Sequence, residues 1–194
     1  MNYPGVASTA VLVMCVILGS WGQDDRPFVE SEIRNWQQVV DRNPKDYETL
    51  AAIGAAYGKL GEHMTAVSYF KRAIEANPSY APAYTGLASA YGFLQRPDEA
   101  LAALRKAVSL DPTDPIAQGK LGTTLGKAAQ YQEAIVHLKE AIRLAPRMAD
   151  AHFALGLAYI SVGDRKKASD EANSLSVLDP QKASRLRYLL DMSK

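Results

Sequence analysis

The sequence has little of what catalysis and metal binding require. Cysteine occurs once among the 194 residues, at Cys15, so the chain can form no internal disulfide. The three histidines, His63, His137 and His152, lie far apart and follow no spacing typical of metal ligands. No glycine-rich loop follows a strand pattern, so the sequence lacks the usual phosphate-binding loop. We therefore expect no enzymatic activity, no catalytic residue, no metal site and no cofactor.

The chain also has no large excess of charge of either sign. The chain contains 22 Lys and Arg against 21 Asp and Glu, which gives a formal net charge of +1. The basic residues are dispersed and form no block that could hold a phosphate backbone. We expect no nucleic-acid partner, and we interpret the basic residues near the end of the chain as a solvated helix face.

Charged side chains are absent altogether from residues 1–22. Within this segment, Val6–Leu18 is a mostly apolar run followed by small and polar residues, as in a secretory signal. No Lys or Arg precedes the run, which departs from that pattern, and Tyr3–Trp21 is just long enough to span a bilayer. We expect residues 1–22 to be a signal peptide, and the protein to be exported, either periplasmic or secreted. The alternative is a membrane anchor, which would be the chain's only contact with the membrane.

A repeat of 34 residues dominates the rest of the chain. Its four copies follow one another without a gap, over residues 47–80, 81–114, 115–148 and 149–182. Position 20 is alanine and position 32 is proline in every copy: Ala66, Ala100, Ala134 and Ala168, then Pro78, Pro112, Pro146 and Pro180. Position 8 is always small: Gly54, Ala88, Gly122 and Gly156.

Each copy has the periodicity of two helices separated by a turn. Apolar residues recur at helical spacing in both halves of the first copy: Leu50, Ile53, Tyr57 and Leu60, then Ala66, Phe70, Ala73 and Ile74. We expect the two helices to cross closely at the small residues, including Ala100 and Ala134. Gly61 permits the turn of the first copy, whereas the third copy has Ala129-Gln130 there, which predicts a tighter or more helical turn. One hairpin cannot bury its own apolar face, so neighbouring copies must stack.

The period and the order of small, aromatic and proline positions resemble the tetratricopeptide repeat (TPR) family. The resemblance implies an all-α fold, a right-handed α-solenoid of helix–turn–helix hairpins. We interpret the chain as a protein–protein interaction scaffold of the cell envelope that binds a peptide or helix of a partner in its concave groove. The alternative is a structural subunit of a larger envelope assembly that uses its convex face or its caps, with no ligand in the groove.

Helical segments flank the four copies. Residues 28–43 end in Asn43-Pro44, as the copies do, and are expected to form an N-terminal capping helix, a half repeat. A docking helix for a partner is the other interpretation of this segment. Residues 183–194 contain Leu186, Leu189 and Leu190 and are expected to form the C-terminal capping helix.

The resemblance also indicates which residues line the groove. In TPR solenoids the first helix of each copy lines the concave side, and positions 2, 5, 9, 12 and 13 commonly face a ligand. Among these positions we select ten residues as the partner-binding groove: Ala51, Ala55, Thr85, Ser89, Phe93, Thr123, Lys127, Phe153, Leu157 and Ile160. The last three either anchor a partner or pack beneath the C-terminal helix.

Some family members hold the C-terminal carboxylate of a chaperone with a clamp of basic residues and asparagines. At the corresponding positions this chain has Ala51, Ala55, Gly86, Ile116 and Lys120, and Lys120 alone fits the clamp. We therefore do not expect this protein to bind chaperone tails.

Overall fold

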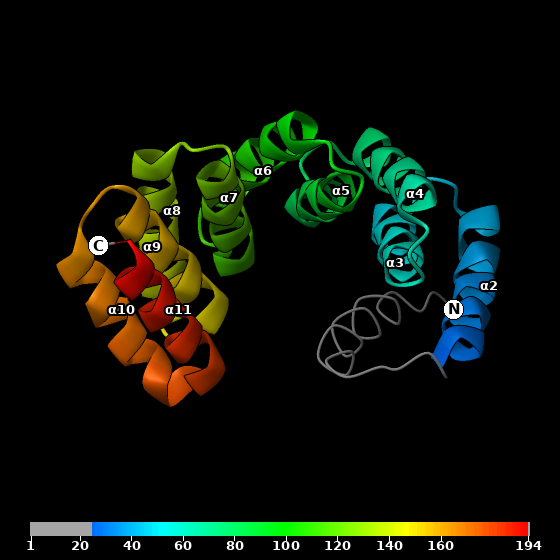
Figure 1. Ribbon diagram of the computed structural model, residues 1–194. Coiled ribbons are helices and arrows are strands. Elements are labelled where there is room, and N and C mark those ends of the chain that lie inside the picture. The colour runs from blue at the N-terminus through cyan, green and yellow to red at the C-terminus, as the bar shows by residue number, and fades with distance from the viewer. Residues whose placement is uncertain (1–24, 194) are drawn as a thin grey trace. The chain divides into compact units, whose positions relative to one another are not determined.

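A computed structural model describes residues 25–193, and within this part of the chain every extended regular element is an α-helix (Figure 1). The helices are α2 (Arg26–Arg42), α3 (Tyr47–Lys59), α4 (His63–Ala76), α5 (Ala81–Phe93), α6 (Pro97–Leu110), α7 (Pro115–Lys127), α8 (Tyr131–Leu144), α9 (Ala149–Ser161), α10 (Arg165–Leu178) and α11 (Pro180–Met192). The expected signal peptide or anchor, residues 1–22, lies outside the described residues.

The chain divides into two compact units between Arg96 and Pro97. Unit 1 contains α2–α5 and unit 2 contains α6–α11. In copies one, three and four, the first helix packs against the second as a hairpin: α3 with α4, α7 with α8, and α9 with α10. Successive hairpins then stack within each unit, α4 on α5 and α8 on α9. The predicted all-α solenoid of helical hairpins is confirmed.

Local sequence signals explain where these helices begin. The side chains of Asp46, Asp114 and Asp164 cap α3, α7 and α10, each accepting a hydrogen bond from a backbone N–H of the first turn at 2.8–3.2 Å. Proline stands in the first turn of α2, α5, α7 and α11, where its missing N–H costs nothing.

The turn of the third copy differs from the sequence expectation. Ala129 adopts a left-handed conformation with φ of 58°, close to the 81° of Gly61 in the first copy. The same backbone bonds close both turns, from Ala129 N to Gly126 O at 3.1 Å and from Gly61 N to Gly58 O at 3.2 Å. The prediction of a tighter or more helical turn is therefore wrong. The packing of α7 against α8 holds an alanine in a backbone region that normally favours glycine.

Small residues lie where the helices of a hairpin cross. A Cβ atom at Gly122 would come within 2.5 Å of Leu138 Cγ and 3.0 Å of the Ala134 carbonyl oxygen. Gly54 is in the same position in the first copy, where an added Cβ atom would lie 3.3 Å from the Ala66 carbonyl oxygen. Ala134 is completely buried, so the predicted close crossing is confirmed there, and Ala100 is also buried.

The first helices of neighbouring repeats approach one another more closely than the second helices do. In unit 1, α3 contacts α5, and in unit 2, α9 contacts both α7 and α11. The second helices make no comparable contact with one another. This holds for α2 and α4 in unit 1 and for α6, α8 and α10 in unit 2. We call the side formed by the first helices the inner face of each unit, and the opposite side the outer face.

The two helices predicted to be caps start earlier than the sequence indicates. Helix α2 begins at Arg26 rather than residue 28, and it buries Val29, Ile33 and Val40. Helix α11 begins at Pro180 rather than residue 183. The other interrepeat prolines lie in turns, whereas Pro180 is already the first residue of α11. Asp179, just before it, caps this helix by accepting a hydrogen bond from Lys182 N at 3.0 Å. Among residues 25–193, no helix combines the length and apolarity needed to cross a bilayer.

We predict that Gly122→Ala destabilises the protein although alanine is the better helix former. The new methyl group meets Leu138 and the Ala134 backbone, and overpacking of this kind costs roughly 1–3 kcal/mol. Gly126→Ala, one turn later in α7, is the matched control, because its Cβ would lie at an ordinary 4.0 Å from Ala134 Cβ. That variant should gain about 0.5–1 kcal/mol from helix propensity. Urea denaturation measures both, and equal stabilities would show that the crossing tolerates a methyl group.

Candidate functional site

The inner face of unit 1 carries short side chains. Of the predicted groove residues, Ala51 and Thr85 are buried, Ser89 is half-buried and Ala55 is exposed. The hydroxyl of Ser89 donates to the Thr85 carbonyl oxygen at 3.0 Å, so it is turned back onto its own helix. Little therefore projects from the middle of this face, and the backbone of another chain can approach the helices closely.

Phe93 lies at the edge of this face rather than on its floor. It is the last residue of α5 and is 71% exposed. Its ring stacks on His63, the first residue of α4, with centroids 4.4 Å apart and planes 1° from parallel. The contact draws Phe93 toward the turn that joins α3 to α4.

The inner face of unit 2 also has short polar side chains on α7. The Thr123 hydroxyl is half-buried and donates to the Gly119 carbonyl oxygen at 2.8 Å, so it is turned back onto α7 as Ser89 is onto α5. Lys127, the last residue of α7, is exposed.

The large apolar residues of α9 have a structural partner. Phe153, Leu157 and Ile160 are half-buried and pack against a buried cluster from α10 and α11: Ala172, Leu175, Ala183 and Leu186. The guanidinium of Arg185, on α11, lies over the Phe153 ring at 5.7 Å. This packing supports the second of the two interpretations of these residues, in which they lie beneath the C-terminal helix. A partner can contact only the part of these side chains that α10 and α11 leave exposed.

A series of polar contacts between repeats was missed in the sequence. The fourth residue of copies two to four makes a hydrogen bond with the carbonyl oxygen of the proline that ends the previous copy. The pairs are Tyr84 with Pro78 at 3.1 Å, Gln118 with Pro112 at 2.9 Å, and His152 with Pro146 at 3.0 Å. The signal was available, because a side chain able to donate stands six residues after Pro78, Pro112 and Pro146. These contacts hold each first helix to the turn before it.

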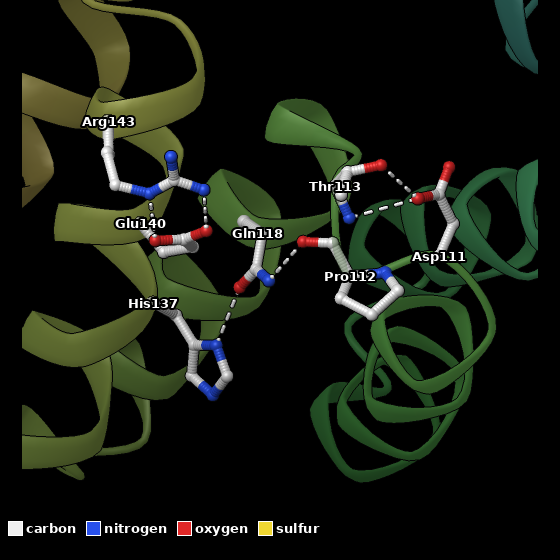
Figure 2. A network of polar contacts seen from close by, with 7 residues as sticks. All are labelled: Asp111, Pro112, Thr113, Gln118, His137, Glu140 and Arg143. Carbon is white, nitrogen blue, oxygen red and sulfur yellow. Dashed lines mark hydrogen bonds and ion pairs between the residues drawn. The ribbon is translucent and has the colours of Figure 1, made fainter.

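Two of these side chains also contact the second helix of their own copy. Figure 2 shows Gln118 between Pro112 and His137, whose Nδ1 donates to the Gln118 amide oxygen at 2.8 Å. His152 is placed similarly, with Nδ1 2.6 Å from a carboxylate oxygen of Glu171. Both histidines therefore have structural partners. No group of His, Cys, Asp and Glu that could hold a metal ion occurs among the described residues.

The outer face of unit 2 has an open depression beside α8. Its volume is about 640 Å³. Two of its lining residues, Glu140 and Arg143, are joined by two hydrogen bonds of 2.8 and 2.6 Å, which Figure 2 shows. The residues that line it are Gln118, Ile135, Val136, His137, Lys139, Glu140 and Arg143.

These features define the class of the protein, a helical-hairpin repeat protein whose accessible surfaces suit contact with other chains. Two family descriptions match the sequence: "Tetratricopeptide repeat" over residues 59–123 and "TPR repeat" over residues 130–163. Together they span about half of the chain. The chain belongs to the tetratricopeptide repeat family. TPR domains bind protein partners, so the fold is that of a protein-interaction scaffold.

Solved TPR structures resemble the whole chain. A crystal structure of MamA is 23% identical, covers 94% of this chain and 99% of its own, and gives a TM-score of 0.72. YrrB, described as "a TPR protein with an unusual peptide-binding site", is 20% identical over 84% of each chain, with a TM-score of 0.70. A thermophilic TPR protein from Thermus thermophilus is 22% identical over 85% of this chain and 90% of its own, with a TM-score of 0.65. At these identities the likeness shows the fold alone. No curated protein matches the sequence significantly.

We predict that His137 makes the stability of the protein depend on pH. Burial lowers the pKa of His137 from its ordinary value of 6.5; Arg105 acts in the same direction, and Glu133 opposes both. The folded protein therefore binds this proton less readily than the unfolded chain. The stabilisation is complete above about pH 6.5 and is lost as the pH falls through the lowered pKa. His137→Asn keeps a donor toward Gln118 without a titrating ring, so its free energy of unfolding should fall less on acidification. Equal pH slopes in urea denaturation would contradict this prediction.

We predict that Phe153→Ala lowers stability by about 1–3 kcal/mol, because the ring is half-buried against α10 and α11. Val177→Ala on α10 is the control, since Val177 is 88% exposed and should change stability by no more than about 0.5 kcal/mol. Thermal denaturation followed by circular dichroism measures both. An unchanged melting temperature for Phe153→Ala would mean that the ring is available to a partner after all.

Proposed function

We propose that the protein is a scaffold of the cell envelope and that it binds a peptide or helix of a partner protein on the inner face of unit 1. The observation that carries the proposal is the lining of this face by short side chains, with Ala55 exposed between buried neighbours. An approaching backbone meets no long side chain in the middle of the face. The description of YrrB as having a peptide-binding site is consistent with this use of the fold.

The choice of unit 1 follows from the packing of unit 2. A central apolar side chain in a well-fitting pocket commonly dominates the binding energy of an interface. In unit 2, the apolar candidates Phe153, Leu157 and Ile160 already pack against α10 and α11. The inner face of unit 1 has no covering helix of this kind among residues 25–96, and Phe93 flanks it at the edge.

The envelope location in this proposal derives from residues 1–22, which carry no charge and contain the apolar run Val6–Leu18. Export to the periplasm or the outside is the interpretation that we propose, with retention by the same segment as the alternative. Fractionation of cells that express the tagged full chain tests the location directly. Recovery of the protein in the cytosol would remove the envelope from the proposal while leaving the inner face untouched.

A specific observation favours a second candidate function, that of a structural subunit. The depression beside α8 lies on the outer face and combines the exposed apolar side chain of Val136 with charged residues of both signs. Such a surface can contact another subunit while the inner face stays empty. The two candidates differ in which face a partner covers.

We predict that Ala55→Trp abolishes capture of the partner, because an indole on the inner face of unit 1 blocks the approach of a backbone. Ala102→Trp is the matched control: it places the same side chain at an exposed alanine of the second-type helix α6. Affinity capture of each tagged variant, followed by mass spectrometry, should recover at least about tenfold less partner with Ala55→Trp, as expected for a loss of about 1.4 kcal/mol or more. Circular dichroism must show both variants folded. Retained capture by Ala55→Trp, with loss in a Val136→Asp variant, would favour the structural-subunit function.

A further inference from the structure

The connection between α10 and α11 is shorter than the other connections from one repeat to the next. Helix α10 ends at Leu178 and α11 begins at Pro180, so Asp179 alone joins them. Each of the other connections has four residues: 43–46, 77–80, 111–114 and 145–148. One residue must therefore turn the chain into α11, and its backbone is extended, with φ of −156° and ψ of 91°.

Pro180 prevents this hinge from joining the two helices into one. A proline disfavours the α-helical region for the residue before it, and its ring clashes with a carbonyl group of the preceding helical turn. Asp179 therefore stays extended, and α10 and α11 remain separate helices in whichever direction α11 leaves the hinge.

Helix α11 completes the packing of the fourth hairpin. In copy three, Leu138 of the second helix covers Gly122, where an added Cβ atom would lie 2.5 Å from Leu138 Cγ. The residue of copy four that corresponds to Leu138 is Ala172, and an added Cβ atom at Gly156 would collide with Leu186 of α11 instead. Leu186 is completely buried. Helix α11 thus supplies the large side chain that α10 lacks.

The hairpin of α9 and α10 depends on α11 to cover its apolar surface. Without α11, it would expose Leu175 together with Phe153, Leu157 and Ile160, which pack against the same cluster. Apolar area of this kind is stabilised by removal from water. The structure shows what removes it, because α11 lies on this surface and contacts both α9 and α10.

Polar contacts fix the position of α11 along the hairpin. The Lys182 ammonium lies 3.2 Å from a carboxylate oxygen of Asp150 on α9. The Arg187 guanidinium donates to the Ser176 hydroxyl at 2.6 Å and to the Asn173 amide oxygen at 3.3 Å, both on α10. These contacts require the sequences of α11 and of the hairpin, but they do not require both to belong to the same chain.

We propose that two copies of this chain exchange α11, so that α11 of one copy packs on the α9–α10 hairpin of the other. The exchange keeps every contact of α11 described above and changes only its direction at Asp179. A short hinge favours such an exchange, which is a low-cost route to a symmetric dimer. With one hinge residue, few conformations return α11 to its own hairpin. The exchange involves unit 2 and does not depend on the proposed binding of a partner to unit 1.

The test mixes chains of different mass. The full chain with natural isotopes and the full chain labelled with heavy nitrogen are unfolded in urea in equal amounts. They are refolded together at high concentration in a mild detergent and weighed by native mass spectrometry. A carbodiimide then couples the Lys182 amine to the Asp150 carboxylate, 3.2 Å away. The coupling of Lys182 to Asp179, at 2.6 Å within one chain, is the matched control.

We expect a dimer in which about half of the Lys182–Asp150 products join a light to a heavy peptide, as random pairing of exchanged chains predicts. The Lys182–Asp179 products should never be mixed. A monomer in the native mass spectrum would overturn the proposal. So would a dimer in which Lys182 and the coupled Asp150 always carry the same isotope, because α11 would then pack on its own hairpin.

Lengthening the hinge is an independent test. Insertion of Gly-Ser-Gly after Asp179 gives this connection four residues, as in the others. The variant should keep its helix content by circular dichroism and become a monomer, because α11 can then return to its own hairpin. Val136→Asp, on the outer face of α8, is the control and should remain a dimer. Persistence of the dimer in the insertion variant, or its loss in Val136→Asp, would contradict the exchange of α11.

Discussion

The close crossing of the two helices within each hairpin is the contact on which the rest of the structure depends. At Gly122 the helices leave no room for a methyl group, and Ala134 on the other helix is completely buried. Because the crossing recurs every 34 residues, each hairpin presents the same apolar faces to the next one. Stacking of equivalent faces then produces the two layers, with the first helices on the inner side.

Hydrogen bonds at the turns between repeats add to this stacking. Tyr84, Gln118 and His152 each bond to the proline carbonyl oxygen of the preceding copy, which would otherwise depend on water. Gln118 and His152 also reach His137 and Glu171 on the second helices. These polar side chains therefore help to hold the repeats together.

The ends of the solenoid differ from its middle at the crossing positions. Glu32 of α2 occupies the position of the buried Ala66, because the same number of residues separates Glu32 from Pro44 and Ala66 from Pro78. Leu190 of α11 likewise occupies the position of Gly122, because it follows Pro180 at the same spacing at which Gly122 follows Pro112. Both side chains are half-buried. A large or charged side chain at these positions leaves less room for a close crossing than glycine or alanine does, which agrees with the prediction that α2 and α11 are capping helices.

The sequence by itself determined the helical hairpins, their register and the buried small residues, because these depend on spacing within a single repeat. The positions of Gly122 and Ala134 at a close crossing were predictable for that reason. Tertiary structure decided what lies over each first helix, since exposure depends on a neighbouring segment that the repeat pattern does not specify. Helix α11 covers Phe153, Leu157 and Ile160, His63 draws Phe93 to an edge, and the packing of α7 against α8 holds Ala129 in a glycine-like turn. The family resemblance indicated which positions line the predicted groove, whereas the exposure of those side chains followed only from the packing around them.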